Sequence, residues 1–354
     1  MPIGVLMLNF GEPEQPVMEE VLPFLERIFL NNTPLERFPS EEAWRARCLD
    51  LARKRAPGLI EDYKRIGGSP LNAQARAEGE ALQAELDRRD LDAHVYVAFQ
   101  FMEPSIEASV RLAREDGVTA LVALPVYPLC GFSTNVAAIR SVRAAAGDLP
   151  VQAVTAFHHD DAYVRYRADN LRAFCAQEDL DLRDPDTLLY FSAHGTPVKY
   201  LELGSRYDGY VEEHCARIAH LMGDVNYTLA YQNHSNRGIA WTEPSNETRL
   251  PTVVERRLVV EPISFIHEQS ETLAELDIDF RSEADALGKQ VFRVPTPQDH
   301  DRLAGILADL IEPALVGAPA ETAGLHACRC APGSFCPNGH REVDCHHARH
   351  QPQA

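Results

Sequence analysis

The sequence predicts an α/β protein of two doubly wound domains, each a mostly parallel sheet covered by helices on both faces. Short apolar runs of strand type alternate with segments of helical period along most of the chain. The length of 354 residues is too great for one ordinary domain and suits two. With 45% apolar and 25% charged residues, the chain has the composition of a soluble globular protein.

The first half of the chain begins with an apolar run at 3–10, which predicts a strand that ends at Gly11. Ser69 is expected to be the N-cap of a long helix, with Pro70 at the first helical position. The other elements predicted in this half are helices at 15–32, 41–56, 104–116 and 133–147 and strands at 93–101 and 119–128.

The alternation begins again near residue 150, where we expect the boundary between the domains. Strands are predicted at 150–157, 187–194, 226–233, 256–265 and 289–295, and helices at 161–177, 206–223, 270–288 and 297–315. The first domain should comprise 1–150 and a closing helix at 298–316, and the second should comprise 151–297. A Cys- and His-rich extension, 317–354, follows.

The charge and the missing motifs exclude several classes of function. A net charge of −19 repels nucleic acid and anionic lipid, so we expect no nucleic-acid partner. No GxGxxG follows the first strand and no P-loop motif occurs, which disfavours dinucleotide and nucleotide binding. The chain lacks a long apolar run and a basic, apolar leader, so it is expected to be cytoplasmic.

Candidate site residues lie at the ends of three predicted strands. Ligands of open α/β sheets bind beyond the carboxyl ends of the strands. His194 ends one predicted strand and is followed by Gly195, which leaves space for a ligand. A buried imidazole bonded to backbone is an equally good interpretation of His194 alone. Two other predicted strands end at candidate site residues. One ends with Asn9, Phe10 and Gly11, and the other is followed by His267, Glu268 and Glu271.

An acidic row accompanies the third of these strand ends. Glu268, Glu271, Glu275 and Asp279 have spacings that form one ridge on an α-helix. The ridge could be an ordinary solvated face. Inside a pocket, however, carboxylates beside an imidazole suit Fe²⁺, Zn²⁺ and proton transfer.

Six motifs in order now resemble one family. They are "MLNFGEP", "YKRIGGSPLNAQ", "LPVYP", "FSAHGTP", "LAYQNHSN" and "PISFIHEQSETLAELDIDF". Together, over about residues 3–315, they resemble ferrochelatase, the enzyme that inserts ferrous iron into a porphyrin to make haem. The resemblance implies two Rossmann-like domains with a porphyrin cleft between them, and porphyrin and Fe²⁺ as substrates.

The resemblance also implies roles for individual residues. The catalytic pair would be His194 and Glu271. The acidic ridge adds Glu268 and Glu275 to the expected path of the iron. This chain has Glu268–Gln269 where the family usually has Asp–His, so one carboxylate is kept and a second imidazole is lost. The residues that match porphyrin-pocket positions are Phe10, Tyr63, Ser69, Tyr127 and Phe265.

The tail holds four cysteines within 18 residues, Cys328, Cys330, Cys336 and Cys345. Many ferrochelatases carry a [2Fe–2S] cluster on a C-terminal cysteine extension, so the resemblance implies such a cluster here. Cys130, in the loop after the "YP" strand, is an alternative ligand in place of one tail cysteine. Four thiolates also suit Zn²⁺, so a zinc site is a second possibility for the tail. A tail that binds no metal is the third.

The predicted activity is insertion of Fe²⁺ into protoporphyrin IX, with coproporphyrin III as the alternative substrate. The alternative outside the enzymes is a non-catalytic porphyrin- or haem-binding protein with an Fe–S sensing tail. A third possibility is a chelatase for cobalt and sirohydrochlorin, whose expected fold is similar. Those chains lack the "SPLNAQ" and "ETLAELDI" segments that this sequence contains. The segment 21–32 resembles an apolar pocket lip that could touch a membrane surface, although an ordinary amphipathic helix explains it equally well.

Overall fold

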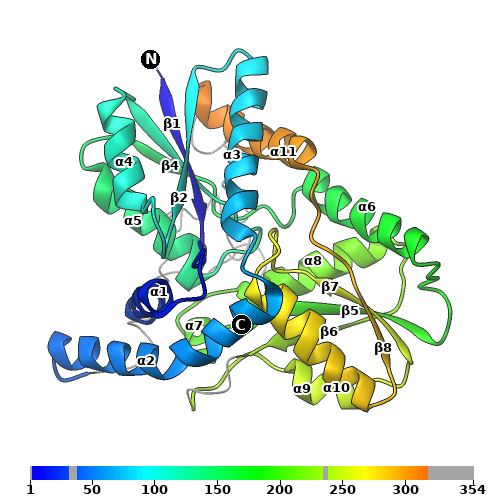
Figure 1. Ribbon diagram of the computed structural model, residues 1–354. Helices are drawn as coiled ribbons and strands as arrows, with labels where there is room; N and C mark the ends of the chain where they lie inside the picture. Colours follow the sequence, from blue (N-terminus) through cyan, green and yellow to red (C-terminus); the bar gives the residue numbers. More distant parts are fainter. Residues whose placement is uncertain (1, 32–37, 234–237, 318–354) are drawn as a thin grey trace, which may run out of the picture.

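Two lobes, each built around a four-stranded sheet, make up the protein in this computed structural model (Figure 1). The structure describes residues 2–31, 38–233 and 238–317. The first sheet has the order β2-β1-β3-β4 and the second β6-β5-β7-β8, and every pairing in both is parallel. The predicted α/β class, with two doubly wound, Rossmann-like sheets, is confirmed. The strands are β1 Ile3–Asn9, β2 Ala93–Phe99, β3 Ala120–Pro125, β4 Val151–Ala153, β5 Thr187–His194, β6 Tyr227–Gln232, β7 Arg257–Pro262 and β8 Gln290–Arg293.

Helices cover both faces of each sheet. The α-helices are α1 Met18–Asn31, α2 Glu41–Ile66, α3 Leu71–Arg88, α4 Ile106–Glu115, α5 Ala137–Ala146, α6 Asp161–Gln177, α7 Val198–Glu202, α8 Tyr207–Leu221, α9 Asn246–Arg249, α10 Arg281–Ala286 and α11 His300–Leu315. Two segments are π-helical, η2 Phe132–Val136 and η5 Glu271–Phe280, and η4 Leu250–Thr252 is a 3₁₀ turn. Within the described residues, no helix is long and apolar enough to cross a membrane.

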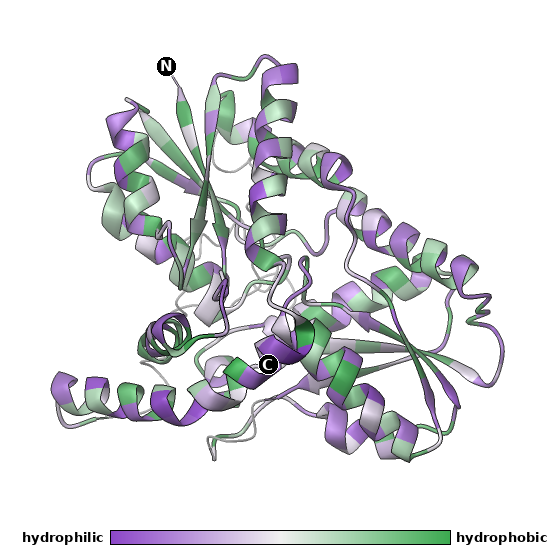
Figure 2. Ribbon diagram, viewed as in Figure 1, coloured by the Kyte–Doolittle hydropathy of each residue, from purple (hydrophilic) through white to green (hydrophobic). Residues whose placement is uncertain are grey.

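The central strand of the first sheet shows why its sequence is a continuous apolar run. Val5 and Met7 pack on one face with apolar residues of α3 and α11. Leu6 and Leu8 pack on the opposite face with residues of α4 and α5. A strand covered on both faces has no polar side, so it carries no alternation of polar and apolar residues. The strands of both sheets are accordingly mostly apolar, while the helices show polar stretches (Figure 2).

The strand that follows residue 150 belongs to the first sheet. β4 lies parallel to β3, with Leu121 opposite Val151, whereas we expected 150–157 to begin the second domain. An apolar run indicates a strand but not its partner, so the sequence pattern does not say which sheet the run joins. The chain therefore leaves the first sheet after β4, and α6 leads into the second.

Several helix boundaries differ from the prediction, and those of α2 and α3 bear on the site. α2 continues through Pro57 to Ile66 and ends at Gly67, whose φ of 78° is left-handed. α3 begins at Leu71, one residue later than expected, and Pro70 holds the cap position without a side-chain bond. The Ser69 hydroxyl accepts a bond from the Leu71 N–H at 3.2 Å and donates to Glu12, so it is tied to the loop after β1 as well as to the helix.

Candidate active site

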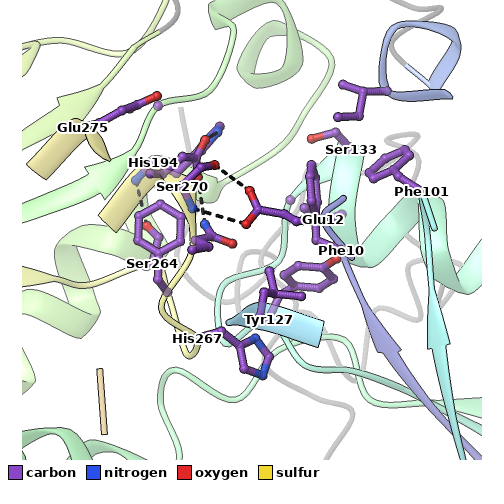
Figure 3. Close-up of a pocket in the computed structure, with 18 of the residues that line it drawn as sticks. Phe10, Glu12, Phe101, Tyr127, Ser133, His194, Ser264, His267, Ser270 and Glu275 are labelled. Carbon is purple, nitrogen blue, oxygen red and sulfur yellow. Dashed lines mark hydrogen bonds and ion pairs between the residues drawn. The ribbon is translucent and has the colours of Figure 1, made fainter. Parts of the chain in front are cut away.

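A cavity lies at the carboxyl ends of β1, β3 and β5 and is lined by both lobes (Figure 3). This is the position at which open α/β sheets bind ligands. One wall is apolar because α1 and α2 turn their buried faces toward it. The wall residues are Phe10, Phe24, Leu25, Ile28, Phe29, Leu59 and Phe101.

The opposite wall carries an imidazole and a carboxylate that face each other. His194 is the last residue of β5, and its Nε2 lies 3.3 Å from Oε1 of Glu271, the first residue of η5. Both side chains are partly open, with exposed fractions of 34% and 19%. Gln269 donates from Nε2 to Glu271 Oε2 at 2.9 Å and holds the carboxylate from its other side.

The electrostatics of this pair favour a protonated imidazole. Burial by itself lowers the pKa of His194, but the charge and hydrogen bond of Glu271, with the charge of Glu275, raise it above its usual value. The His194 backbone N–H donates to Ser264 Oγ at 3.0 Å, which fixes the strand end. The ring can therefore take up a proton and be stabilised as an ion pair.

Gly195 makes this strand end geometrically feasible. A Cβ at Gly195 would lie 1.8 Å from Asn233 Oδ1 and 2.8 Å from the Gln232 carbonyl oxygen. The Gly195 N–H donates to that same carbonyl at 2.7 Å. The chains that leave the parallel neighbours β5 and β6 run so close together that only a residue without a side chain fits at Gly195.

The acidic ridge lies on a π-helix, not on the predicted α-helix. Glu271 and Glu275 both line the cavity, and Gln232 Nε2 joins them by donating to the Glu271 carbonyl at 3.0 Å and to Glu275 Oε2 at 3.2 Å. Asp279 does not line the cavity, and it pairs at 2.6 Å with Arg65 of α2. π-helical turns are rare and occur often at functional sites.

Glu268 lies outside the cavity, contrary to the ridge we expected. Its carboxylate pairs with Arg293 of β8 and accepts bonds from the Thr272 hydroxyl and the Thr296 N–H. Because Glu268 precedes η5, helical spacing does not govern the direction of its side chain. Its bonds instead tie the start of η5 to β8.

His267 does not replace the second imidazole that the family pattern usually has. It lines the cavity, but its Nε2 lies 2.7 Å from Oε2 of Glu78 on α3. Burial alone raises the pKa of Glu78, yet His267 and His300 together lower it, which keeps the carboxylate ionised. His267 therefore forms part of a contact between the two lobes.

Four of the five predicted porphyrin-pocket residues, Phe10, Tyr63, Tyr127 and Phe265, line the cavity. Phe10 packs edge-on against Phe101, with ring centres 4.6 Å apart. The Tyr127 hydroxyl donates to Gln100 Oε1 at 2.8 Å. Ser69 does not line the cavity, because its side chain is bonded to Glu12.

Glu12 is a cavity residue that sequence reasoning did not single out. It follows β1 and is only 4% exposed. Burial raises the pKa of its carboxyl, although hydrogen bonds from Ser270 and Ser69 partly oppose the shift. Its place in the quoted "NFGEP" motif was a signal, but nothing in that motif showed that the side chain points toward the second lobe.

The predicted cluster ligands divide into two groups. Cys328, Cys330, Cys336 and Cys345 lie outside the described residues. Cys130 is 3% exposed and packs within the apolar core beside Leu129 and Phe132. The role of Cys130 as an alternative ligand therefore stays a prediction of the sequence.

Comparison with known proteins identifies relatives over nearly the whole chain. The family model described as ferrochelatase matches residues 2–315. A ferrochelatase of Nostoc sp. (strain PCC 7120) is 33% identical over 88% of this chain and 82% of its own length. A ferrochelatase of Synechococcus sp. (strain JA-3-3Ab) is 34% identical over 90% of this chain and 95% of its own.

One solved structure, described as SirB from Bacillus subtilis with Fe3+, is 10% identical with a TM-score of 0.49, over 86% of this chain and 92% of that one. The family rests on the sequence matches, which include the strand end with His194 and the segment with Glu271. The chain belongs to the ferrochelatase family.

Proposed function

We propose that this protein inserts Fe²⁺ into protoporphyrin IX and forms haem with release of two protons. Membership of the ferrochelatase family supports insertion of metal into a porphyrin. The observation that carries the proposal is the His194–Glu271 pair, which faces a cavity whose opposite wall is apolar. A flat, apolar macrocycle fits such a wall, and the pair supplies proton acceptors beside it.

Proton removal is the task that the pair performs. Metal insertion must take two N–H protons from the macrocycle, and neutral imidazole is a suitable acceptor near neutral pH. We assign the first acceptance to the His194 imidazole, which lies beside Glu271. Glu271 then stabilises the imidazolium, and Gln269 keeps the carboxylate in place.

Glu275 extends the acceptor pair along η5. Gln232 bonds to the backbone of Glu271 and to the carboxylate of Glu275, so the two acidic residues are held along one side of the cavity. We assign Glu275, with His194 and Glu271, to the path by which Fe²⁺ enters or protons leave. Glu268 is left out of this path because its oxygens bind Arg293, Thr272 and Thr296.

The charge of the cavity wall favours protoporphyrin over coproporphyrin. Coproporphyrin carries more carboxylates and needs more cationic partners. Among the described residues that line the cavity, Arg55 is the only arginine or lysine, and it also pairs with Asp62 at 3.6 Å. Phe10, Phe24 and Phe101 offer contacts of the kind that vinyl and methyl groups make.

Two other expectations stay predictions of the sequence. One is a [2Fe–2S] cluster on the four tail cysteines, with Cys130 as the alternative ligand in place of one of them. The other is peripheral membrane contact by the segment 21–32, nearly all of which lies in α1. Neither expectation enters the chemistry assigned to His194 and Glu271.

The test is an anaerobic insertion assay with Fe²⁺ and each porphyrin in turn, following loss of porphyrin fluorescence and growth of haem absorbance. We expect wild type to use protoporphyrin IX in preference to coproporphyrin III. His194→Ala should lose at least about 100-fold in kcat, the range of one general base, and still quench porphyrin fluorescence on binding. Binding without turnover by wild type would instead indicate a porphyrin-binding protein, and equal turnover by His194→Ala would refute the role of His194.

A further inference from the structure

Glu12 connects the two lobes beside the reacting pair. Its carboxylate accepts a bond from the Ser69 hydroxyl of the first lobe. From the second lobe it accepts the Ser270 hydroxyl at 2.5 Å and the Ser270 backbone N–H at 3.2 Å (Figure 3). Asn72 fixes the backbone of Glu12 by bonding to its N–H and to its carbonyl oxygen, at 3.0 and 2.7 Å.

Ser270 is the N-cap residue directly before η5. The first N–H groups of a helix have no partner within the helix, and a negative charge near them is favourable. Ser270 caps η5 with no side-chain bond of its own to the helix, and its N–H is bound by Glu12. Glu12 thus acts as a cap that the first lobe supplies to a helical segment of the second.

We propose that Glu12 is a positioning residue that holds Ser270, and through it the Glu271 carboxylate, in the geometry required opposite His194. The proposal rests on the proposed function of the His194–Glu271 pair. Glu271 directly follows Ser270, so a shift of Ser270 changes the 3.3 Å contact between Glu271 and His194. A misplacement of about 1 Å can reduce the rate of an enzyme by about 100-fold.

Substitutions at both ends of the contact test the link. Glu12→Gln preserves the shape, but an amide has one acceptor oxygen and cannot accept all three bonds. Ser270→Ala removes the hydroxyl and keeps the backbone bond, whereas Ser270→Thr keeps both. We expect kcat to fall by about 10-fold or more in Glu12→Gln, with KM for porphyrin nearly unchanged because the apolar wall is intact. The kcat of Ser270→Ala should fall by less than that of Glu12→Gln. The kcat of Ser270→Thr, which keeps the hydroxyl, should be close to that of wild type.

A double variant separates positioning from an independent effect. If Glu12 acts through Ser270, Glu12→Gln combined with Ser270→Ala should lose little more kcat than Glu12→Gln alone. Glu14→Gln is the matched control in the same loop, because Glu14 is half-exposed, pairs with Arg76 on the surface and does not line the cavity. Its kcat should equal that of wild type. Additive losses, or a wild-type kcat in Glu12→Gln, would overturn the proposal.

Crystal structures of wild type and Glu12→Gln provide a readout that does not depend on turnover. We expect Glu271 Oε1 to move away from His194 Nε2 in the variant, and an unchanged contact would also overturn the proposal. A wild type without turnover would reject the proposed function and leave this structural test valid. The two failures are therefore distinguishable.

Discussion

At the scale of single residues, the site depends on how neighbouring charges adjust one imidazole. Burial favours neutral His194, while Glu271 and Glu275 favour its protonated form and prevail. A proton acceptor must be neutral, so activity should rise as the pH rises through the pKa of His194. The carboxylate that stabilises the product of proton transfer thus also sets the lower pH limit of activity.

Glu271→Gln should move that limit. Without the carboxylate charge, burial dominates and lowers the pKa of His194, so the imidazole stays neutral at lower pH. We expect the acid limb of kcat/KM to shift to lower pH and the maximal rate to fall. A pH–rate profile, with an NMR titration of the His194 ring, measures both. Glu202→Gln, an exposed side chain of α7, is the control, and an unmoved acid limb in Glu271→Gln would contradict the electrostatic link.

The sequence predicted the proximity of His194 and Glu271 better than the surroundings of this pair. His194 and Glu271 were found because their motifs are local and follow strands whose ends meet at one edge of a sheet. Glu12 was missed and Glu268 was placed in the pocket, because the direction of both side chains depends on partners distant in sequence, Ser270 and Arg293. Spacing along the chain carries no information about such partners.

At the scale of elements, the strand ends bring the loops close together. The need for a small residue at Gly195 was predictable, but its cause was not: the Gln232 carbonyl and the Asn233 side chain lie directly beside it. Similarly, the acidic residues predicted a helix from 270, while its first ten residues are π-helical. Apolar periodicity indicates a helix and does not distinguish the wider π turn from the α turn.

Gly195→Ala should therefore disrupt the element that carries His194. A Cβ 2.8 Å from a backbone oxygen forces the backbone to move, so we expect a loss of about 1–3 kcal/mol in the free energy of unfolding, together with lower kcat. Urea unfolding and the insertion assay measure the two effects. Gly209→Ala is the matched control in α8, since its Cβ would meet no atom within 4 Å and should not destabilise the protein. Equal stability of the two variants would contradict the close approach of the Gln232 carbonyl to Gly195.

At the scale of the whole molecule, α6 joins the cores of the two lobes. Tyr163 and Tyr166 pack with the first sheet, and Val164 and Leu171 pack with the second. Between them, Arg167 is fully buried and pairs with Glu261 of β7. Arg167 also donates to the carbonyls of Pro262 and Phe265, so it supports the loop that carries Phe265 into the cavity.

Arg167→Met should destabilise the protein by about 3–5 kcal/mol, because it leaves Glu261 buried without its cationic partner. In the double variant Arg167→Met/Glu261→Leu no charge is left unpaired, so part of the loss should be recovered. Thermal or urea unfolding of the three proteins measures the difference. A double variant less stable than Arg167→Met would show that the carboxylate is stabilised by other groups.

The return of α11 to the first lobe has a consequence for synthesis on the ribosome. The first sheet and α3 are made early, yet their apolar face is covered by Leu303, Leu307 and Ile311 of the helix that is made late. Domains usually complete their folding in the order in which they are translated. Here the second lobe can close first, and the N-terminal lobe must wait with exposed apolar surface until residue 315 has left the exit tunnel.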